Sequence, residues 1–212
     1  MAMTRRTFLY LSAVGTLAVV AGCAGDDTEP DETGSDPGDT GDTGDTGDTE
    51  SCGEPTSSDI EGPFYVADVP VREDLDLYGH EGVKLALEGR ILDAACAPIA
   101  NAVIEIWHAD PEGAYDNDSA DRRYRGQTAT AADGSWRFST LVPGRYLNGP
   151  TYRPAHIHVK VWIDGVEQLT TQLYFEGDPF NESDAWAEES RMMPVVEESA
   201  DSWSCSFDFV MA

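Results

Sequence analysis

Two histidines separated by a single residue, His156 and His158, form the most chemically informative pair in the sequence. They stand in the segment RPAHIHVKVWI (153–163), in which polar and aliphatic side chains alternate. Because successive side chains of a β-strand point to opposite faces, the two histidines share one face and the aliphatic residues share the other. Two neutral imidazoles about 7 Å apart along a strand can be bridged by one metal ion. The pattern indicates a metal site, with ordinary hydrogen-bonded histidines as the alternative.

Two tyrosines are the candidates for further ligands, because no Asp or Glu has a spacing that completes a two-histidine, one-carboxylate iron(II) site. Tyr115 lies in a loop just after an expected strand, and Tyr146 lies in a turn shortly before the histidine strand. A phenol has a solution pKa of about 10, so it becomes a ligand only where a strongly charged cation stabilises the phenolate. Two phenolates favour iron(III) over zinc or copper(I). A tyrosine that is only hydrogen-bonded in or beside the core is the alternative.

The elements that must position these residues are short strands. From Cys52 onward, β-branched and aromatic segments alternate with Gly, Pro, Asp and Asn, without an apolar stripe of helical period. This pattern predicts an all-β fold, an antiparallel β-sandwich with long active-site loops. Turns are expected at the Asp-Gly pairs 133–134 and 164–165, and a short helix around 184–189. The expected strands cover residues 83–92, 102–108, 134–141, 155–163, 169–175 and 204–211.

The N-terminus has the features of an export signal. Residues 1–23 combine the pair Arg5-Arg6, an apolar run and the sequence Val-Ala-Gly-Cys, which predicts a twin-arginine signal peptide with a lipobox and lipidation at Cys23. A retained membrane span is the alternative, but the apolar run 7–21 falls short of the roughly 20 residues that cross a bilayer. We therefore expect an exported, periplasmic or cell-surface protein, lipid-anchored to a bacterial membrane.

Residues 24–51 are expected to form a disordered acidic linker. Between positions 26 and 50 the chain contains only Asp, Glu, Thr, Gly, Pro and Ser, with a Gly-Asp-Thr repeat and eleven carboxylates, so it has no aliphatic side chain to bury. It contributes part of the formal net charge of −27, which disfavours nucleic acid as a partner. The folded domain is expected over residues 52–212, a length sufficient for one core.

The four cysteines predict a disulfide rather than a zinc site. If Cys23 is lipidated, Cys52, Cys96 and Cys205 remain in an oxidising compartment, and the simplest arrangement is one disulfide and one free thiol. The spacing leaves open which two cysteines pair. No two of them form a CxxC, so a zinc knuckle is not expected.

Taken together, the motifs of residues 60–180 resemble the intradiol ring-cleavage dioxygenases, the family of catechol, hydroxyquinol and protocatechuate dioxygenases, and in particular its exported single-domain members. The segments that carry the resemblance include EGPFY (61–65), AVIEIWHAD (102–110), PGRY (143–146), RPAHIH (153–158) and TQLYFEGD (171–178). The resemblance implies a β-sandwich with one iron(III) between its sheets, held by Tyr115, Tyr146, His156 and His158. It also implies cleavage of an aromatic 1,2-diol by dioxygen between the two hydroxylated carbons, giving a muconate-type diacid.

The resemblance also implies roles for residues beside the metal. Arg153 is expected to stabilise the bound diolate, Gln172 to be the active-site glutamine, and Tyr146 to act as a base for substrate protons. Tyr65 is expected to line the substrate pocket or, alternatively, to pack the N-terminal arm onto the sandwich. The segment 147–152 is shorter than in the best-studied members and lacks their Trp, which favours an open pocket for larger diols.

A function of a different class is a non-catalytic, surface-anchored β-sandwich that binds aromatic ligands or glycans through Trp107, Trp136 and Trp162. The enzyme is preferred because four ligand positions and two neighbouring positions are all present. The expected partners are a small aromatic diol and dioxygen, with a membrane contacted only through the lipid anchor. A homo-oligomer is compatible with the sequence.

Overall fold

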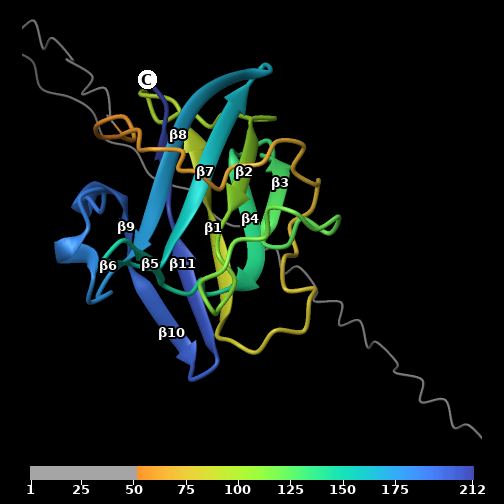
Figure 1. The fold of residues 1–212 in the computed structure, drawn as a ribbon. Helices are drawn as coiled ribbons and strands as arrows, with labels where there is room; N and C mark the ends of the chain where they lie inside the picture. Colours follow the sequence, from red (N-terminus) through yellow and green to blue (C-terminus); the bar gives the residue numbers. More distant parts are fainter. Residues whose placement is uncertain (1–51) are drawn as a thin grey trace, which may run out of the picture. The chain divides into compact units, whose positions relative to one another are not determined.

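Two five-stranded β-sheets lie against each other in the computed structural model, which describes residues 52–212 (Figure 1). A two-stranded sheet and two short 3-10 helices complete the described elements. This arrangement confirms the expected all-β fold. The expected signal peptide, the lipidation of Cys23 and the linker 24–51 lie outside the described residues. Within the part of the chain that is described, no helix has the length and apolar character required to cross a bilayer.

Strand β1 is the centre of the first sheet. The sheet contains β1 (Lys84–Leu92), β4 (Ser135–Leu141), β10 (Val195–Ser199), β11 (Ser202–Ser206) and β12 (Phe209–Val210). β4 is antiparallel to β1, whereas β11 and β12 run parallel to it, so this sheet is mixed. Gly89 of β1 permits the parallel pairing, because a Cβ at this position would overlap the carbonyl group of Phe207, which lies between β11 and β12.

The second sheet carries the histidine strand. In spatial order it contains β3 (Arg125–Ala129), β2 (Val103–Trp107), β7 (His156–Ile163), β8 (Val166–Phe175) and β9 (Met192–Met193). The turn between β7 and β8 is formed by Asp164 and Gly165, whose φ angles of 51° and 76° are those of a hairpin turn that matches the twist of the strands. Gly134 also has a positive φ, 75°, in the turn before β4. Both expected Asp-Gly turns are therefore confirmed.

The core fills the space between the two sheets. Ile157, Val159 and Val161 of β7 have no exposed surface and pack in one cluster with Leu85 and Leu87 of β1. The expected aliphatic face of the histidine strand is thus confirmed. Since alternate side chains point to opposite faces, the histidine face of β7 points away from the first sheet. The implied position of the metal between the two sheets is therefore wrong, because that space is occupied by aliphatic side chains.

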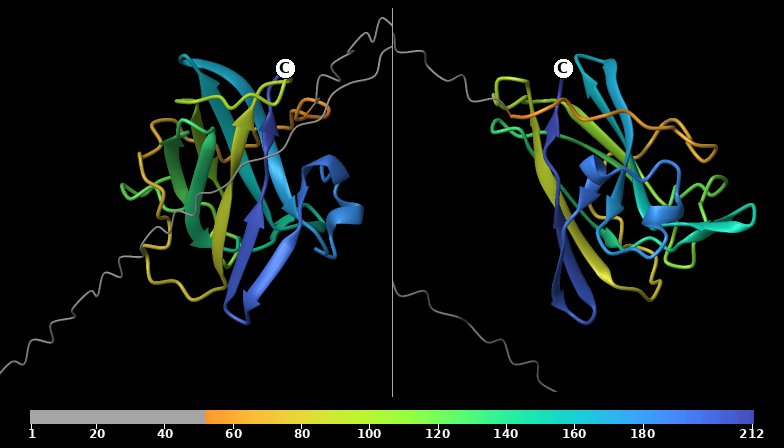
Figure 2. Two further views of the ribbon diagram at one scale, coloured as in Figure 1. Left: turned by 180° about the vertical axis from the view of Figure 1, so that it is seen from behind. Right: turned by 90° about the vertical axis from the view of Figure 1, so that its left-hand side faces the viewer.

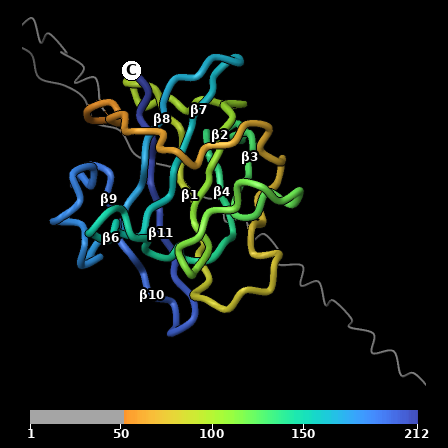
Figure 3. The backbone as a smooth tube through the Cα atoms, viewed as in Figure 1, coloured from red at the N-terminus to blue at the C-terminus, as the bar shows by residue number. Residues whose placement is uncertain are grey.

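The N-terminal arm, residues 52–82, covers the outer face of the second sheet with its first part, whereas further along the arm Asp74 pairs with Ser139 of β4 and Leu75 enters the core. Its first part crosses β7 and β8 on the side away from β1, as the orange trace shows (Figures 2 and 3). Backbone and side-chain hydrogen bonds attach it there: the amide of Asp59 donates to the carbonyl of Thr170, and the Thr171 hydroxyl donates to the carbonyl of Ser57, both at 2.9 Å. The arm therefore forms a second layer over the histidine face.

Every expected strand region contains an observed strand, but several short strands were not expected. These are β3, β5 (Tyr146–Asn148), β6 (Thr151–Arg153), β9 and β10. The expected helix at 184–189 is wrong, since only the 3-10 helices η1 (Asn181–Ser183) and η2 (Glu189–Arg191) form in this region. Asp184 is extended, with φ −89° and ψ 128°, and its carboxylate accepts the amide of Trp186. This local bond competes with helical backbone pairing.

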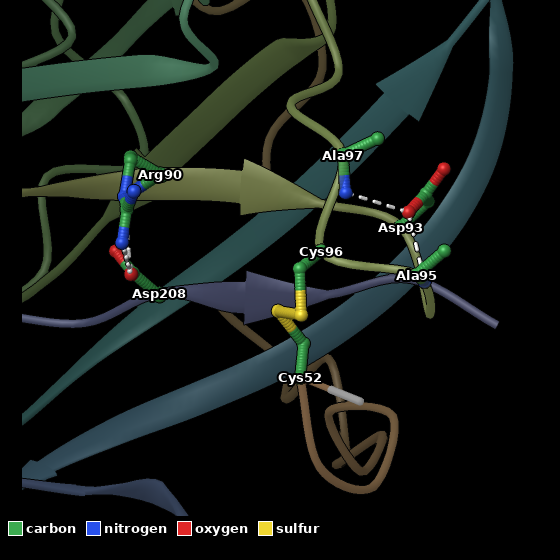
Figure 4. Close-up of a disulfide and its surroundings, with 7 residues drawn as sticks. All are labelled: Cys52, Arg90, Asp93, Ala95, Cys96, Ala97 and Asp208. Atoms are coloured by element: carbon green, nitrogen blue, oxygen red, sulfur yellow. Dashed lines mark hydrogen bonds and ion pairs between the residues drawn. A yellow bond between two sulfur atoms is a disulfide. The ribbon is translucent and has the colours of Figure 1, made fainter. Parts of the chain in front are cut away.

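The pairing that the sequence left open is Cys52–Cys96, with Cα atoms 5.0 Å apart, and Cys205 is a buried free thiol. Figure 4 shows the disulfide joining the start of the arm to the turn that follows β1. In this turn, the carboxylate of Asp93 accepts the amides of Ala95 and Ala97, both at 2.9 Å. The disulfide therefore anchors the arm to a turn that is already held by its own hydrogen bonds.

The disulfide closes a segment of 44 residues, and cross-links of this kind stabilise a domain by about 2–4 kcal/mol, mainly through the unfolded chain. We expect Cys96→Ser to lower the free energy of unfolding by this amount in urea titrations. Reductant should lower the free energy of unfolding of the wild-type chain by the same amount. It should have no further effect on the variant. Cys205→Ala is the control, which should keep the wild-type response to reductant. A wild-type chain that is insensitive to reductant would contradict the assigned pairing.

Candidate metal centre

A row of buried polar side chains occupies the outer face of the second sheet. His156, His158 and Lys160 of β7 are 2%, 1% and 4% exposed. Trp107 of β2 and Gln172 of β8 stand opposite His158 in the neighbouring strands. The indole ring of Trp107 stacks on the imidazole of His158, with ring centres 4.7 Å apart and planes 8° from parallel. The strand pairing therefore fixes where the His158 ring lies.

The hydroxyl of Tyr115 lies between the two imidazoles. Its oxygen is 3.2 Å from Nε2 of His156 and 3.1 Å from Nε2 of His158. Nδ1 of His156 lies 2.7 Å from the carbonyl oxygen of Pro154. Since a carbonyl only accepts, this nitrogen carries the proton, and Nε2 presents a lone pair to the centre. Two ring nitrogens and a phenol oxygen thus converge on one point, which is the arrangement of a metal site.

Two glycines bring the loops of the two tyrosines together. A Cβ on Gly113 would overlap the carbonyl group of Arg145, and a Cβ on Gly144 would overlap the amide of Gly113. Gly113 also has a φ of 89°, which side-chain-bearing residues rarely adopt. Because only glycine permits this approach, the loop of Tyr115 packs directly against the turn that leads into Tyr146.

Tyr146 stands beside this group at the start of β5. Its ring centre is 5.7 Å from that of Tyr115 and 5.6 Å from that of His156. Phe64 of the N-terminal arm stacks on Tyr115 at 4.2 Å and meets Tyr146 edge-on at 5.7 Å. The structure thus brings all four expected ligands together, from β7, from the start of β5 and from one loop. It adds Phe64 as an aromatic cover that sequence reasoning missed, although the residue stands within the EGPFY motif.

The protonation states of these groups fit a bound cation. Burial, together with the neighbouring Tyr146, raises the pKa of Tyr115 far above its usual range. Burial, together with the charge of Arg153, lowers the pKa of His156 to about 3, and burial also lowers the pKa of His158 well below its usual value. Both imidazoles are therefore neutral at pH 7, while a phenolate requires a strongly charged cation beside it. This set of nitrogen and phenol donors matches a hard trivalent ion such as iron(III).

Arg153, the expected diolate-binding residue, borders the centre. It is 3% exposed, and its Nη1 lies 3.5 Å from Nε2 of His156. Burial alone lowers the pKa of Arg153, but hydrogen bonds to Asp184 and Tyr146 more than compensate, so the pKa lies above its usual value. A permanent positive charge therefore stands next to the site where a diolate would bind.

Gln172 and Tyr65 have their observed contacts with the N-terminal arm and with the strands of the second sheet. Gln172 has no exposed surface, and its side-chain amide donates to a backbone carbonyl of the N-terminal arm at 2.9 Å. Tyr65 packs on Trp107 with ring centres 5.0 Å apart, and the ammonium of Lys160 lies 4.6 Å from the tyrosine ring centre. Burial and the carboxylate of Glu105 raise the pKa of Tyr65 to about 12. These contacts fit the alternative role of Tyr65, which is to pack the arm onto the sandwich.

A second group of potential ligands lies at the surface. His80, Asp110 and Glu112 place ligand atoms within 4.8 Å of one another, among the residues that the structure describes. Nδ1 of His80 is hydrogen-bonded to the hydroxyl of Tyr124 at 3.0 Å. One carboxylate oxygen of Asp110 already accepts the amides of Glu112 and Ala114. These groups therefore have partners without a metal, and Glu112 is exposed.

Cavity size does not identify the centre. A cavity of about 600 Å³ is lined by Arg145, Phe175 and Trp203, and one of about 450 Å³ borders the loop of Tyr115. Neither is lined by the two histidines. The convergence of donor atoms is the stronger indicator here, because Phe64 and the arm fill the space above them.

Comparison with known proteins points to one family. The dioxygenase family matches residues 60–212. Chlorocatechol 1,2-dioxygenase of Rhodococcus opacus is 31% identical over 193 residues, which cover 75% of this chain and 73% of that protein. Catechol 1,2-dioxygenase 2 of Acinetobacter lwoffii is 34% identical over 165 residues, which cover 68% and 60%. The chain spans between about half and three quarters of the length of such curated relatives.

The similar solved structures are also dioxygenases. The dioxygenase domain of a dioxygenase and carbohydrate-binding protein fusion from Streptomyces sp. SirexAA-E is 39% identical with a TM-score of 0.68, covering 74% of this chain and 97% of that one. Catechol 1,2-dioxygenase from Pseudomonas arvilla C-1 is 28% identical with a TM-score of 0.66, covering 74% and 62%.

The two groups of potential ligands can be separated by iron content. We expect the purified chain to retain ferric ion in competition with a chelator. His158→Ala should weaken the affinity for iron by more than about 100-fold. Removing a residue that hydrogen-bonds to a metal ligand typically costs 10–100-fold in affinity, and removing the ligand itself costs more. His80→Ala is the matched control and should keep the wild-type iron content by elemental analysis. Loss of iron in the His80 variant alone would place the metal at the surface group instead.

A buried histidine next to the centre predicts an acid-sensitive fold. His108 is 1% exposed, and burial lowers its pKa to about 4. In the unfolded chain the same group titrates near 6.5. As the pH falls from about 6.5 to 4, the unfolded chain binds a proton that the folded chain does not, so this group lowers the free energy of unfolding by roughly 1.4 kcal/mol per pH unit. In urea titrations of the metal-free chain, His108→Gln should therefore flatten this pH dependence, and a slope equal to the wild-type slope would contradict the assignment.

Proposed function

This chain belongs to the dioxygenase family, and on that premise we propose that it is an intradiol enzyme, which cleaves an aromatic 1,2-diol between its hydroxylated carbons with dioxygen and forms a muconate-type diacid. The observation that carries the proposal is the position of the Tyr115 hydroxyl, within 3.2 Å of Nε2 of both His156 and His158. Tyr146 and Arg153 beside this point supply a second phenol and a fixed cation. Relatives named as catechol and chlorocatechol dioxygenases support the reaction class.

Iron(III) is the proposed cofactor, one per domain. Tyr115, Tyr146, His156 and His158 would hold it, and no thiol lies in the set. When bound, ferric iron withdraws electron density from a diolate and so makes the ring reactive toward dioxygen. The protein's contribution is to place the donors before the substrate arrives, on a strand whose other face is fixed by the core.

The residues around the centre supply charge, proton transfer and exclusion of water. The guanidinium of Arg153 would stabilise the negative charge of the bound diolate in a buried, low-dielectric setting. Tyr146, which is hydrogen-bonded to Arg153, is the proposed acceptor of a proton from a diol hydroxyl. Phe64 covers the ring of Tyr115 and, with the N-terminal arm, keeps bulk water from this side.

The wall near Tyr146 supports a pocket that accepts substituted diols. Residues 147–152 form nearly all of the short β5–β6 hairpin, in which Leu147 pairs with Tyr152, and these two side chains are 58% and 47% exposed. A short hairpin encloses less of a ligand than a long loop does, so larger diols than catechol are proposed as substrates. Export and lipid anchoring remain proposals that rest on Arg5-Arg6 and Cys23.

The competing binding-module function loses its main support. Trp107 is 0% exposed and Trp136 is 4% exposed, so two of its three tryptophans cannot contact a ligand at the surface. Trp162 alone is partly exposed, and a single ring is a weak platform for a glycan or an aromatic polymer.

Turnover of a diol panel tests the proposed reaction. Catechol, chlorocatechols and hydroxyquinol should each be tested for oxygen uptake, with ¹⁸O₂ to show that both oxygen atoms enter a diacid product. Tyr146→Phe should lower kcat by at least about 100-fold, because removing a general base typically costs 10²–10⁴-fold. Tyr78→Phe, whose ring packs on Tyr124, is the control and should retain wild-type kcat. A semialdehyde product, or no oxygen uptake with any diol, would refute the intradiol assignment.

A further inference from the structure

The guanidinium of Arg153 is held on two of its three edges. Its Nε donates to Oδ2 of Asp184 at 2.7 Å, and its Nη2 donates to Oδ1 of the same carboxylate at 3.2 Å. The same Nη2 also donates to the hydroxyl of Tyr174 at 3.1 Å. A guanidinium has five N–H donors, so these bonds use three of them. The other two are on Nη1, which faces the centre: it lies 3.5 Å from Nε2 of His156, and the hydroxyl of Tyr146 is the further polar neighbour of this guanidinium.

Burial makes this orientation rigid. The side chains of Arg153 and Asp184 are 4% and 3% exposed, and Tyr174 has no exposed surface. The indole ring of Trp186 covers the guanidinium plane at 4.6 Å. Rotation of Arg153 would leave a buried carboxylate without its partner, which is strongly unfavourable. Nη1 is therefore the group that the fold presents to the centre.

The hydroxyl of Tyr174 is itself oriented by a second buried pair. It donates to Oδ2 of Asp59 at 3.0 Å, and that oxygen lies 3.1 Å from Nη2 of Arg191. Oε1 of Gln172, at 3.3 Å, is a second acceptor within reach of this single proton. With either acceptor, an oxygen lone pair of Tyr174 is left to accept the N–H of Arg153. The side chains of Asp59 and Arg191 are 3% and 2% exposed, so this chain of contacts runs through the interior from the N-terminal arm to Arg153.

We propose that Asp184 and Tyr174 are positioning residues, which aim the two Nη1 donors of Arg153 at an anionic oxygen of the diol bound in the metal centre. The inference rests on the proposed function and deepens it. Donors that are fixed in advance stabilise developing charge without reorganising during the reaction. Asp184 also keeps the guanidinium from turning toward the diol by its Nε edge, because its carboxylate occupies that edge.

Two substitutions separate positioning from simple stabilisation. Asp184→Asn keeps the shape and removes the charge, and Tyr174→Phe removes only the hydroxyl. We expect kcat to fall by about tenfold or more in the first and severalfold in the second, less than the 10²–10³-fold cost of deleting such a donor outright. The dissociation constant for 4-nitrocatechol without oxygen should rise by a smaller factor than kcat falls, because the donors contact the bound anion but act more strongly on charge that develops during reaction. Asp184→Glu should recover most of the lost kcat.

Asp208→Asn is the matched control. Asp208 forms a two-pronged pair with Arg90 on the first sheet, 2.8 and 3.2 Å from the guanidinium nitrogens (Figure 4). This variant should retain wild-type kcat, which shows that breaking an Arg–Asp pair elsewhere has no such effect. Wild-type kcat in folded Asp184→Asn and Tyr174→Phe would overturn the proposal, as would a Glu variant no better than the Asn variant. If Asp184→Asn does not fold, Tyr174→Phe decides.

A structural readout keeps this test independent of turnover. In a crystal structure of Tyr174→Phe, we expect Nη1 of Arg153 to move away from its 3.5 Å distance to His156. An unchanged guanidinium would overturn the positioning role, whether or not any diol is cleaved. Absence of turnover in the wild-type chain would instead refute the proposed function alone.

Discussion

Most of the charged side chains buried on the outer face of the second sheet are paired with groups from other segments, and this pairing shapes the rest of the domain. Among the described residues, the ring nitrogens Nδ1 of His158 and Nε1 of Trp107 on this face have no hydrogen-bond partner. The ammonium of Lys160 lies 2.7 Å from carboxylate oxygens of both Glu61 and Glu167. Arg153 is paired with Asp184, and His156 donates to a backbone carbonyl. Glu61 belongs to the N-terminal arm, as do the carbonyl of Ile60, which accepts from Gln172, and the carboxylate of Asp59, which accepts from Tyr174. The face beneath the arm carries polar side chains, so the arm is held there by hydrogen bonds and ion pairs.

Core packing and close backbone contacts hold the centre in place before any ligand arrives. The aliphatic residues of β7 are locked in the core, which fixes the direction of the two histidines on the opposite face. Gly113 and Gly144 let the loops of Tyr115 and Tyr146 touch backbone to backbone. Donors from β7, from the start of β5 and from one loop thus converge without a long flexible segment between them and the core. Little ordering is therefore left for ligand binding to impose.

Much of the fold could be predicted because it depends on neighbours in the sequence. Alternation marked the strands with strong aliphatic periodicity, and the Asp-Gly pairs marked two turns. Strands such as β3, RGQTA, lack that periodicity and form because adjacent strands supply hydrogen-bonding partners. The helix expected at 184–189 failed for a related reason: Asp184 is committed to Arg153 and to the amide of Trp186, and a long-range ion pair overrode local helix preference.

By itself, the sequence determined the chemical types of the four ligands, the shared face of His156 and His158, and the family resemblance. Tertiary structure alone decided that the centre lies outside the sandwich, that Cys52 pairs with Cys96, and that Phe64 rather than Tyr65 covers the ligands. The physical reason is range. Alternation and turn preferences act over a few residues, whereas the contact between Tyr115 and His156 spans 41 positions and the disulfide spans 44, and such contacts are selected only when the packed sheets bring distant segments to the same face.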